Sequence, residues 1–298
     1  MGELFDIKAA LRENAEAVET FLAGVMDRHD GDTESIFDAQ RYSLLGGGKR
    51  IRAYLANAVC RLLGGSPECS MPLAAAVEMI HAYSLIHDDL PCMDDDDMRR
   101  GKPSNHKVFG YSGALLAGDA LLTGAFGVIA DATALDDGAK VRAIGLLSAC
   151  AGDRGMIGGQ VMDLDGEGRR LEFDKLLKLH SMKTGALIRC SALLGCVAAG
   201  VDTEGEQARD IARYADRIGL AFQVVDDVLD VTATEAELGK SVGSDADSGK
   251  TTFLSYYSTD EAMSYARRLT EGAKGAIGHM EGSEELCLLA DLLLGRSN

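Results

Sequence analysis

Proline and aromatic residues are scarce in this chain. All four prolines lie between residues 67 and 103, there is no tryptophan, and aromatic residues make up only 5% of the sequence. Residues 104–298 therefore contain no proline, and long proline-free sequence rich in Ala, Leu and Glu favours helix. Strand-like alternation of apolar and polar residues is also missing, as are hairpin turns between such runs. The sequence excludes a β-rich fold and predicts an all-α protein.

Disulfide, zinc and targeting motifs are missing too. The seven cysteines are scattered, with no CxxC or CxC spacing. An odd and dispersed set indicates free thiols in a reducing compartment rather than a disulfide framework. Residues 1–20 have no apolar signal core. The longest uncharged apolar stretch, residues 190–201, is too short to span a bilayer. We therefore expect a cytoplasmic protein that is not in a membrane.

Positive charge is in deficit. The chain has 30 Lys and Arg against 47 Asp and Glu, which gives a formal net charge of −17. Such a chain is repelled by the backbone of nucleic acids and by anionic membrane surfaces. Its length of 298 residues suits one large core or two ordinary domains. Because no linker of disordered composition divides it, we expect one domain over residues 1–298.

The apolar periodicity predicts ten helices joined mostly by short connections. The expected ranges are 3–28, 35–45, 50–63, 71–90, 113–131, 137–152, 172–199, 204–232, 260–277 and 283–294. In the range 204–232 an apolar stripe recurs at spacings of three and four, formed by Ile211, Ala215, Ile218, Phe222, Val225 and Leu229. Asp226 lies about 60° from this stripe and Asp230 about 100°. Both are predicted to lean inward, whereas a solvated acidic face would lie opposite the stripe.

Two aspartate-rich motifs carry the strongest chemical signal. One is DDLPCMD, with Asp88, Asp89 and Asp94, and the other is DDVLD, which starts at Asp226. Like charges placed so close together repel and disfavour ionisation, so they need a reason to coexist. Mg²⁺ prefers carboxylate oxygens and is usually bound through one or two of them together with substrate phosphates. The two motifs therefore predict a diphosphate held between them.

The first motif coincides with the end of a helix. Pro91 disfavours helix at Leu90, so Asp88 and Asp89 belong to the last turn. A continuous helix would place Asp94 about 120° from Asp88, so the chain must fold back for both to share cations. His81 precedes Asp88 by seven residues and lies on the same face. It is either a structural histidine or one that contacts a ligand.

Basic residues follow glycines or the acidic run. Lys49 and Arg52 come after Gly46–Gly48, at the expected start of a helix, where backbone amides and the helix dipole favour an anion. The spacing is not that of a Walker A loop. Arg99 and Arg100 follow four consecutive aspartates, and arginine suits bidentate binding of phosphate. A divalent-cation buffer would explain the aspartates but not these cations.

With these motifs the chain resembles the trans-isoprenyl diphosphate synthases, in particular the bacterial short-chain farnesyl diphosphate synthases. The segments that carry the resemblance are LLGGGKRIR (44–52), HAYSLIHDDLPCMDDDDMRRGKPSNH (81–106), AGDALL (117–122), GGQVMDLDGE (158–167), KTGALIR (183–189), FQVVDDVLD (222–230) and LGK (238–240). They occur in the family's order and cover most of the chain. The resemblance implies a single-domain helical bundle around a deep central cavity, with homodimer formation.

The resemblance also implies a role for each motif. Three Mg²⁺ ions, for which Mn²⁺ can substitute, would be held by Asp88, Asp94 and Asp226, supported by Asp89, Asp227 and Asp230, with Asp230 counted among the metal residues. The allylic diphosphate would be bound by Arg99, Lys183, Thr184, Gln223, Lys240 and Lys250. Isopentenyl diphosphate would be bound by Lys49, Arg52, His81 and Arg100. Arg99, Lys183, Thr184 and Gln223 would take part in catalysis.

The implied reaction is a head-to-tail condensation. The allylic C–O bond ionises, carbonyl oxygens near Lys183 and Thr184 and the Gln223 amide stabilise the cation, and isopentenyl diphosphate attacks it. Tyr83 resembles an aromatic floor that stops growth at fifteen carbons, although it also fits a core aromatic. Geranylgeranyl or geranyl diphosphate thus remain alternative products. A class I terpene cyclase or a non-catalytic subunit is disfavoured, because both motifs and their basic partners are complete.

Overall fold

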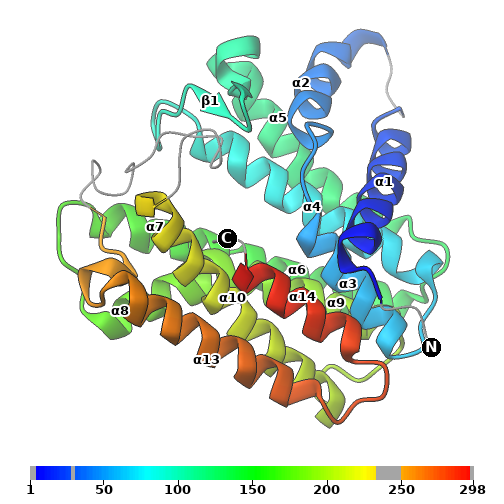
Figure 1. Ribbon diagram of the computed structural model, residues 1–298. Coiled ribbons are helices and arrows are strands. Elements are labelled where there is room, and N and C mark those ends of the chain that lie inside the picture. Colours follow the sequence, from blue (N-terminus) through cyan, green and yellow to red (C-terminus); the bar gives the residue numbers. More distant parts are fainter. Residues whose placement is uncertain (1–4, 28–30, 233–249, 296–298) are drawn as a thin grey trace.

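The computed structural model describes residues 5–27, 31–232 and 250–295, and helices account for nearly all of their regular structure (Figure 1). The helices are α1 (Ile7–Met26), α2 (Glu34–Leu44), α3 (Ile51–Leu62), α4 (Pro67–Asp88), α5 (Asn105–Ala130), α6 (Asp137–Ala151), α7 (Met156–Gly166), α8 (Phe173–His180), α9 (Ala186–Ala198), α10 (Glu206–Thr232), α13 (Thr259–Ile277) and α14 (Glu284–Leu294). Short 3₁₀ turns occur at Gly31–Thr33 and Phe253–Ser255, and a π turn at Ser181–Gly185. The prediction of an all-α fold is confirmed.

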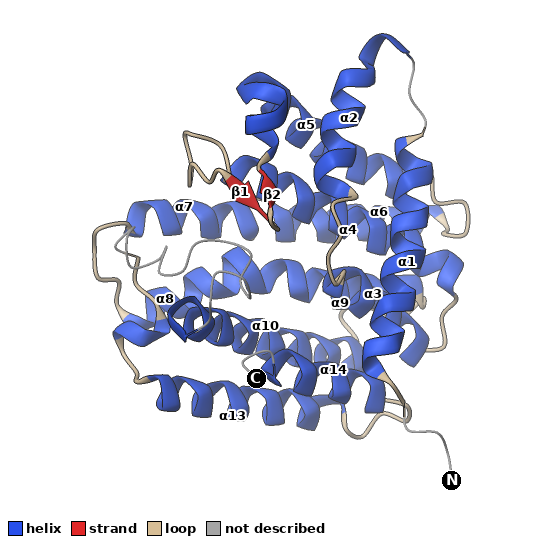
Figure 2. Cartoon of the chain, turned by 45° about the horizontal axis from the view of Figure 1, so that its top comes forward, coloured by secondary structure: helices blue, strands red, loops and turns tan. Residues whose placement is uncertain are grey.

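The helices pack as a bundle whose centre is formed by α3, α4 and α9 (Figure 2). Almost every residue of α9 is buried, as is most of α4. α5 packs along α4, and α13 packs along α10. This arrangement sets the C-terminal end of α4, which carries the first aspartate motif, near the π turn and α10, which carry Lys183 and the second motif.

Several expected boundaries are wrong. α4 begins at Pro67 rather than at residue 71, because proline fits the first helical turn, where its missing N–H costs nothing. The expected helix over 172–199 is interrupted by the π turn at Ser181–Gly185. α5 begins at Asn105, although Gly110 within it has a non-helical φ of 77°. The regular part of α5 therefore starts close to the expected residue 113.

Two elements were not predicted at all. One is a short antiparallel hairpin in which β1 (Met98–Arg99) pairs with β2 (Lys102–Pro103). The other is α7, whose glycines make it resemble a loop in the sequence. One of these glycines, Gly159, is required by a close contact. A Cβ at this position would lie 2.2 Å from the backbone nitrogen of Lys183. Glycine here lets α7 approach the π turn, and the close approach outweighs its poor helix propensity.

Within residues 5–27, 31–232 and 250–295, two helices are long and apolar enough to cross a membrane by length and composition. α4 has 72% of its most apolar window buried in the fold, whereas the corresponding value for α5 is 33%. The expectation from uncharged runs alone did not identify these helices, because one or two charged residues interrupt each apolar window. α4 is therefore a core helix of the bundle, while α5 presents an apolar surface.

Candidate functional site

The first aspartate motif folds back on itself. Asp88 is the last residue of α4, and the Asp94 N–H donates a hydrogen bond of 2.9 Å to the Asp88 carbonyl. This return of the chain matches the prediction from Pro91. The Asp89 side chain is buried and accepts hydrogen bonds from Arg99, one of them 2.9 Å long from Nε. Arg99 also lies 3.2 Å from Asp96, so its guanidinium is positioned by two carboxylates.

The surroundings of Asp88 raise its pKa to about 6. Burial is the main cause, and the negative charges of Asp94 and Asp89 act in the same direction, whereas Lys183 and Arg99 oppose them. Lys183 comes from the second half of the chain, in the π turn between α8 and α9. The motif is therefore a concentrated set of carboxylates that faces a cation from another helix.

The second aspartate motif lies on α10 and is directed inward, as its angle to the apolar stripe predicted. Asp227 and Asp230 are 3% and 4% exposed, and Asp226 is half-buried. Asp227 accepts hydrogen bonds from the Gln223 amide (2.9 Å) and from the Phe253 N–H (2.8 Å). It therefore joins α10 to the segment that precedes α13. Burial lowers the pKa of Arg52, and the negative charges of Glu78 and Asp226 partly offset this effect.

A chain of opposite charges joins the two halves of the protein. Lys183 Nζ lies 2.6 Å from Asp163 Oδ2, and Lys250 Nζ lies 3.6 Å from the same oxygen and 3.4 Å from Asp94 Oδ1. Although burial raises the pKa of Asp163, the neighbouring Lys183 and Lys250 ammonium groups bring it below its usual value. Asp163 was not predicted as a site residue. Its signal is its place in GGQVMDLDGE, a segment quoted above without a role for any residue.

The residues expected to bind the allylic diphosphate largely come together. Thr184 Oγ1 donates a 2.9 Å hydrogen bond to Gln223 Oε1, which fixes the orientation of that amide. A cavity of about 80 Å³ lies beside this pair. Its polar lining is Asp163, His180, Lys183, Gln223, Asp227, Lys250, Thr251 and Thr252. Arg99 lies nearer the first motif, where its charge acts on Asp88. Lys240 lies outside the described residues.

The four residues expected to bind isopentenyl diphosphate share one cavity. It has a volume of about 280 Å³, and its lining includes Lys49, Arg52, His81 and Arg100. Burial and the nearby arginines keep the pKa of His81 well below its usual value, so its imidazole is neutral at neutral pH. The backbone carbonyl of Gly47 accepts a hydrogen bond from Arg100. A Cβ on Gly48 would lie 3.3 Å from the Arg100 guanidinium, so glycine leaves room for it.

Arg50 lies between Lys49 and Arg52 in the sequence and also lines that cavity, but it has a different role. Its side chain is only 2% exposed and forms ion pairs with Glu78 (3.4 Å) and Glu19 (3.2 Å). It also donates to the Leu44 carbonyl and adopts a left-handed φ of 48° directly before α3. Glu78 in turn accepts a 3.0 Å hydrogen bond from the Ala53 N–H. Arg50 therefore anchors the start of α3, a role that the sequence KRIR does not reveal.

Tyr83 lies in the core, one turn before the end of α4. It is 5% exposed, and its ring packs edge-on against His87 with the ring centroids 5.7 Å apart. Burial, together with the charge of Asp88, raises its pKa to about 12. Its buried hydroxyl has no hydrogen-bond partner. Tyr83 thus lies beneath the first aspartate motif, and its role in product length stays a prediction.

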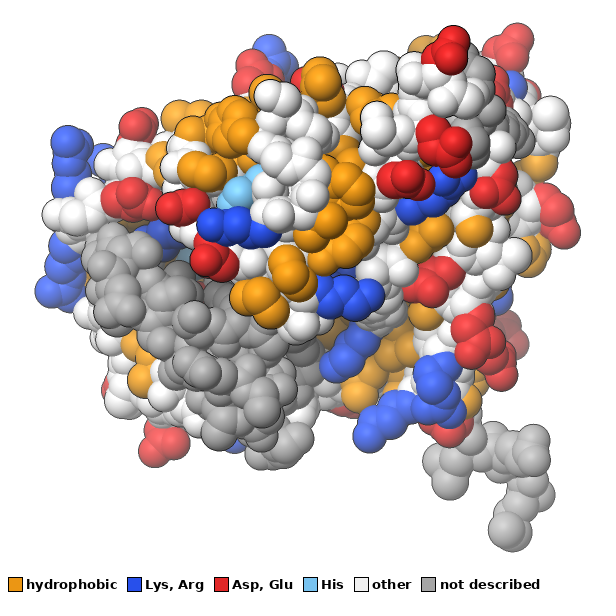
Figure 3. Space-filling model, turned by 90° about the horizontal axis from the view of Figure 1, so that it is seen from above, with side chains coloured by type: hydrophobic (Ala, Val, Ile, Leu, Met, Phe, Trp, Pro, Cys, Tyr) orange, Lys and Arg blue, Asp and Glu red, His pale blue; other side chains and the backbone are white. Residues whose placement is uncertain are grey.

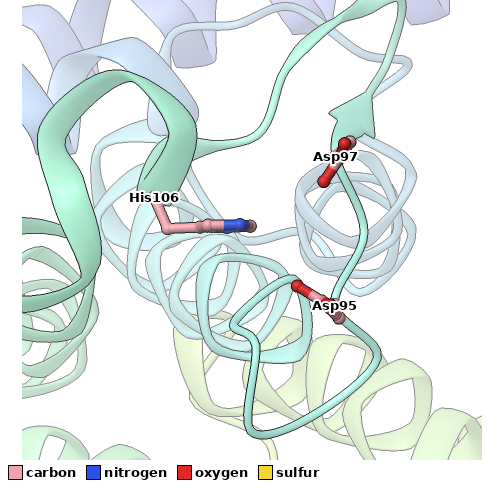
Figure 4. Close-up of side chains that lie close together, drawn as sticks. All are labelled: Asp95, Asp97 and His106. Carbon is pink, nitrogen blue, oxygen red and sulfur yellow. The ribbon is translucent and has the colours of Figure 1, made fainter.

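Within the described residues, three donors of metal-binding type come within 4.8 Å of one another only at Asp95, Asp97 and His106 (Figure 4). The carboxylates predicted to hold Mg²⁺, among them Asp88, Asp94 and Asp226, do not form such a set. Their carboxylate oxygens therefore do not all lie within 4.8 Å of one another. That spacing suits ions which complete their coordination with phosphate oxygens and water.

The chain matches the family model described as polyprenyl synthetase over residues 33–281. It is 43% identical to a chloroplastic geranylgeranyl pyrophosphate synthase of Catharanthus roseus over 299 residues, which cover 99% of this chain and 82% of that protein. It is 45% identical to the farnesyl diphosphate synthase of Geobacillus stearothermophilus over 252 residues, 83% of each chain.

Among solved structures, the chain is similar to the geranyltransferase of Helicobacter pylori complexed with magnesium and isoprenyl diphosphate. The TM-score is 0.83 at 32% identity, and the match covers 99% of this chain and 98% of the other. Such coverage extends the likeness beyond the motifs to the whole bundle.

Proposed function

The chain belongs to the polyprenyl synthetase family, and from this premise we propose that it makes farnesyl diphosphate. It is a trans-prenyltransferase that condenses isopentenyl diphosphate with allylic diphosphates. In the proposed sequence, dimethylallyl and then geranyl diphosphate are extended head to tail, with release of diphosphate. The observation that carries the fifteen-carbon product is the place of Tyr83, which is buried on α4 five residues before Asp88. The condensation site is supported by Lys250, which contacts Asp94 after the first motif helix and Asp163 on α7.

Mg²⁺ fits the donors at this place. Asp88, Asp94, Asp226 and Asp230 offer only carboxylate oxygens, the ligand type that Mg²⁺ prefers. Burial is the main cause of the raised pKa of Asp88, and the charges of Asp94 and Asp89 add to it, so a nearby cation would favour the ionised carboxylate. When bound, Mg²⁺ supplies charge that neutralises the diphosphate as the C–O bond breaks. We propose three ions, as the resemblance to the trans-isoprenyl diphosphate synthases implies.

The protein's own groups perform the remaining tasks. Lys183, Lys250 and Arg99 bind the leaving diphosphate and stabilise its growing negative charge. The Gln223 amide oxygen, which the Thr184 hydroxyl and Asp227 hold in one orientation, directs a partial negative charge toward the allylic cation. Lys49, Arg52 and Arg100 hold the second diphosphate, and neutral His81 donates a hydrogen bond to it. The departing diphosphate accepts the proton that is lost after the new bond forms.

Fixing two anionic substrates side by side removes much of the entropic barrier. The two cavities meet at α10, because Phe222 lines the larger one and the next residue, Gln223, lines the smaller one. The condensation therefore takes place where α4 and α10 face each other.

The assay for this function is a product-length measurement. Purified protein is incubated with Mg²⁺, labelled isopentenyl diphosphate and dimethylallyl or geranyl diphosphate, and the prenyl product is sized. We expect a fifteen-carbon product from the wild type and a longer one from Tyr83→Ala. Tyr83→Phe is the matched control, because it keeps the ring and removes only a hydroxyl without a partner.

Twenty-carbon product from the wild type would instead support the geranylgeranyl alternative, which the similarity to the Catharanthus roseus enzyme favours. Turnover in excess chelator, or undiminished turnover by Asp226→Ala, would contradict the metal assignment. We expect Asp226→Ala to remain folded, since it removes one of several mutually repelling charges.

We also propose a homodimer that buries the apolar face of α5. Four large apolar residues on this helix are between 37% and 53% exposed, namely Val108, Tyr111, Leu115 and Leu116. Figure 3 shows hydrophobic side chains gathered among charged ones on the face seen from above. A second copy is the proposed occupant rather than lipid, because Lys107 and Asp119 interrupt the face. Leu116→Asp should yield monomers in light scattering, whereas Val141→Asp, on the exposed face of α6, should not.

The location in the cytoplasm is part of the same proposal. All seven cysteines are free thiols, as expected in a reducing compartment.

A further inference from the structure

Asp95, Asp97 and His106 form a cluster that the proposed reaction does not use. One carboxylate oxygen from each aspartate and one imidazole nitrogen lie within 4.8 Å of one another. The aspartates come from the loop between α4 and β1, and the histidine comes from the first turn of α5. Figure 4 shows the ring of His106 reaching from α5 toward the segment that carries both carboxylates. Two segments that are separate in the chain therefore offer three donors to one point.

His106 is the feature that distinguishes this cluster from an ordinary acidic loop. His106 is only 8% exposed, and its Nε2 atom is buried with no hydrogen-bond partner. Its Nδ1 atom lies 3.2 Å from the Ser104 hydroxyl. A buried polar atom without a partner is costly, so this nitrogen favours a partner such as water or a bound ion. With the imidazole proton on Nδ1 and directed to Ser104, Nε2 presents a lone pair.

This arrangement matches a common metal-binding design. A histidine that binds a metal usually gives its other ring nitrogen to a neighbouring hydrogen-bond acceptor, which fixes the tautomer and the ring plane. Ser104 occupies that place for His106. The loop is also fixed locally, because the Ser104 N–H donates a 2.9 Å hydrogen bond to the Asp97 carbonyl.

The charge near the cluster is consistent with a cation site. Lys107 Nζ lies 2.5 Å from Asp97 Oδ1, and its side chain is 42% exposed. The ammonium is thus a partner that water can replace when another cation arrives. Removing Lys107 should therefore tighten the binding of a cation, because the ammonium no longer competes for Asp97.

We propose that Asp95, Asp97 and His106 bind one divalent transition-metal ion, separate from the Mg²⁺ held by the two aspartate motifs. One imidazole and two carboxylates suit Zn²⁺, Co²⁺ or Mn²⁺, whereas Mg²⁺ takes oxygen ligands. The bound ion links the loop that carries Asp94 to the start of α5. It thereby restrains the hairpin that carries Arg99 and Arg100. The site requires no particular product length and does not depend on the proposed reaction.

The test uses Co²⁺ as a spectroscopic probe on the full chain, in a large excess of Mg²⁺ that occupies the carboxylate-only sites. We expect the wild type to bind Co²⁺ with visible absorption bands that indicate nitrogen ligation. His106→Gln should lose these bands. Ser104→Ala should weaken binding by roughly 10- to 100-fold, because the histidine is no longer oriented. Lys107→Met should tighten binding.

Two further variants make the outcome decisive. Asp226→Ala should keep the bands, and their loss there would assign the probe to the catalytic carboxylates and overturn the proposal. Asp97→Asn changes a side chain that is 71% exposed, so it decides the question if circular dichroism shows that His106→Gln is unfolded. Equal binding by the wild type and Asp97→Asn, or no binding by the wild type, would also overturn the proposal.

Discussion

Replacing Glu78 by glutamine removes one charge from a buried ion pair while leaving the side-chain shape almost unchanged. Arg50 and Glu78 are 2% and 3% exposed, and their charged atoms are 3.4 Å apart. At an effective dielectric constant of about 20, two charges at this distance attract by about 5 kcal/mol. Breaking a buried pair by removing one partner costs about 3–5 kcal/mol, because the other charge is left in the interior.

The local contacts place the expected cost at the lower end of that range. Arg50 keeps Glu19, which is 3.2 Å away and 37% exposed, and it keeps the Leu44 carbonyl. Glutamine also keeps an oxygen for the Ala53 N–H. We therefore expect Glu78→Gln to lower the free energy of unfolding by about 3 kcal/mol. With an unfolding entropy of about 2.1 cal/mol/K per residue, a chain of this length would lose about 5 °C in Tm.

The assay is thermal and urea unfolding at fixed protein concentration, with two matched controls. Glu19→Gln removes the exposed partner of Arg50 and should cost less than about 1 kcal/mol. The double variant Arg50→Met with Glu78→Met should be more stable than Glu78→Gln, because it leaves no buried charge unpaired. If Glu78→Gln unfolds within about 1 °C of the wild type, or if the double variant is the least stable, the reasoning about this pair is refuted.

Three further predictions concern the site and its support. Asp163→Asn should lower kcat/KM for the allylic substrate by about tenfold to 100-fold, because Lys183 loses the charge of its partner at 2.6 Å. The KM for isopentenyl diphosphate should change little, and equal effects on both substrates would contradict this prediction. Gly118→Ala should destabilise the fold by about 1–3 kcal/mol, because the new Cβ would lie 2.1 Å from His87 Nε2. The control is Gly127→Ala on the same helix. Its Cβ meets nothing within 4 Å, so this variant should be more stable than the wild type. The pKa of His81 is lower in the folded than in the unfolded state, so protonation favours unfolding. The free energy of unfolding should fall as the pH decreases below about 6.5, by up to about 1.4 kcal/mol per pH unit. Urea unfolding between pH 5 and 8 should show a weaker pH dependence of stability in His81→Gln than in the wild type, and the same pH dependence in both would refute this prediction.

The sequence by itself determined the helical class, the two aspartate motifs and the basic residues near them. These features can be predicted from local sequence, namely from residue type, apolar periodicity and the effect of Pro91 on the helix before it. The same signals predicted that Asp94 folds back toward Asp88 and that Asp230 is directed inward. They also indicated the family, because its motifs lie in short contiguous segments.

Only the tertiary structure decided which of these residues meet. Lys250 contacts Asp94 across 156 positions in the sequence, and Arg50 contacts Glu78 across 28. Helical periodicity fixes the face on which a side chain lies but not the helix that packs against it. For that reason the roles of Arg50 and of the cluster at His106 have no distinct signal in the sequence, and Asp163 is marked only by its place in GGQVMDLDGE. Their partners are set by how α3, α4, α5 and the π turn pack, which depends on contacts between residues far apart in the chain.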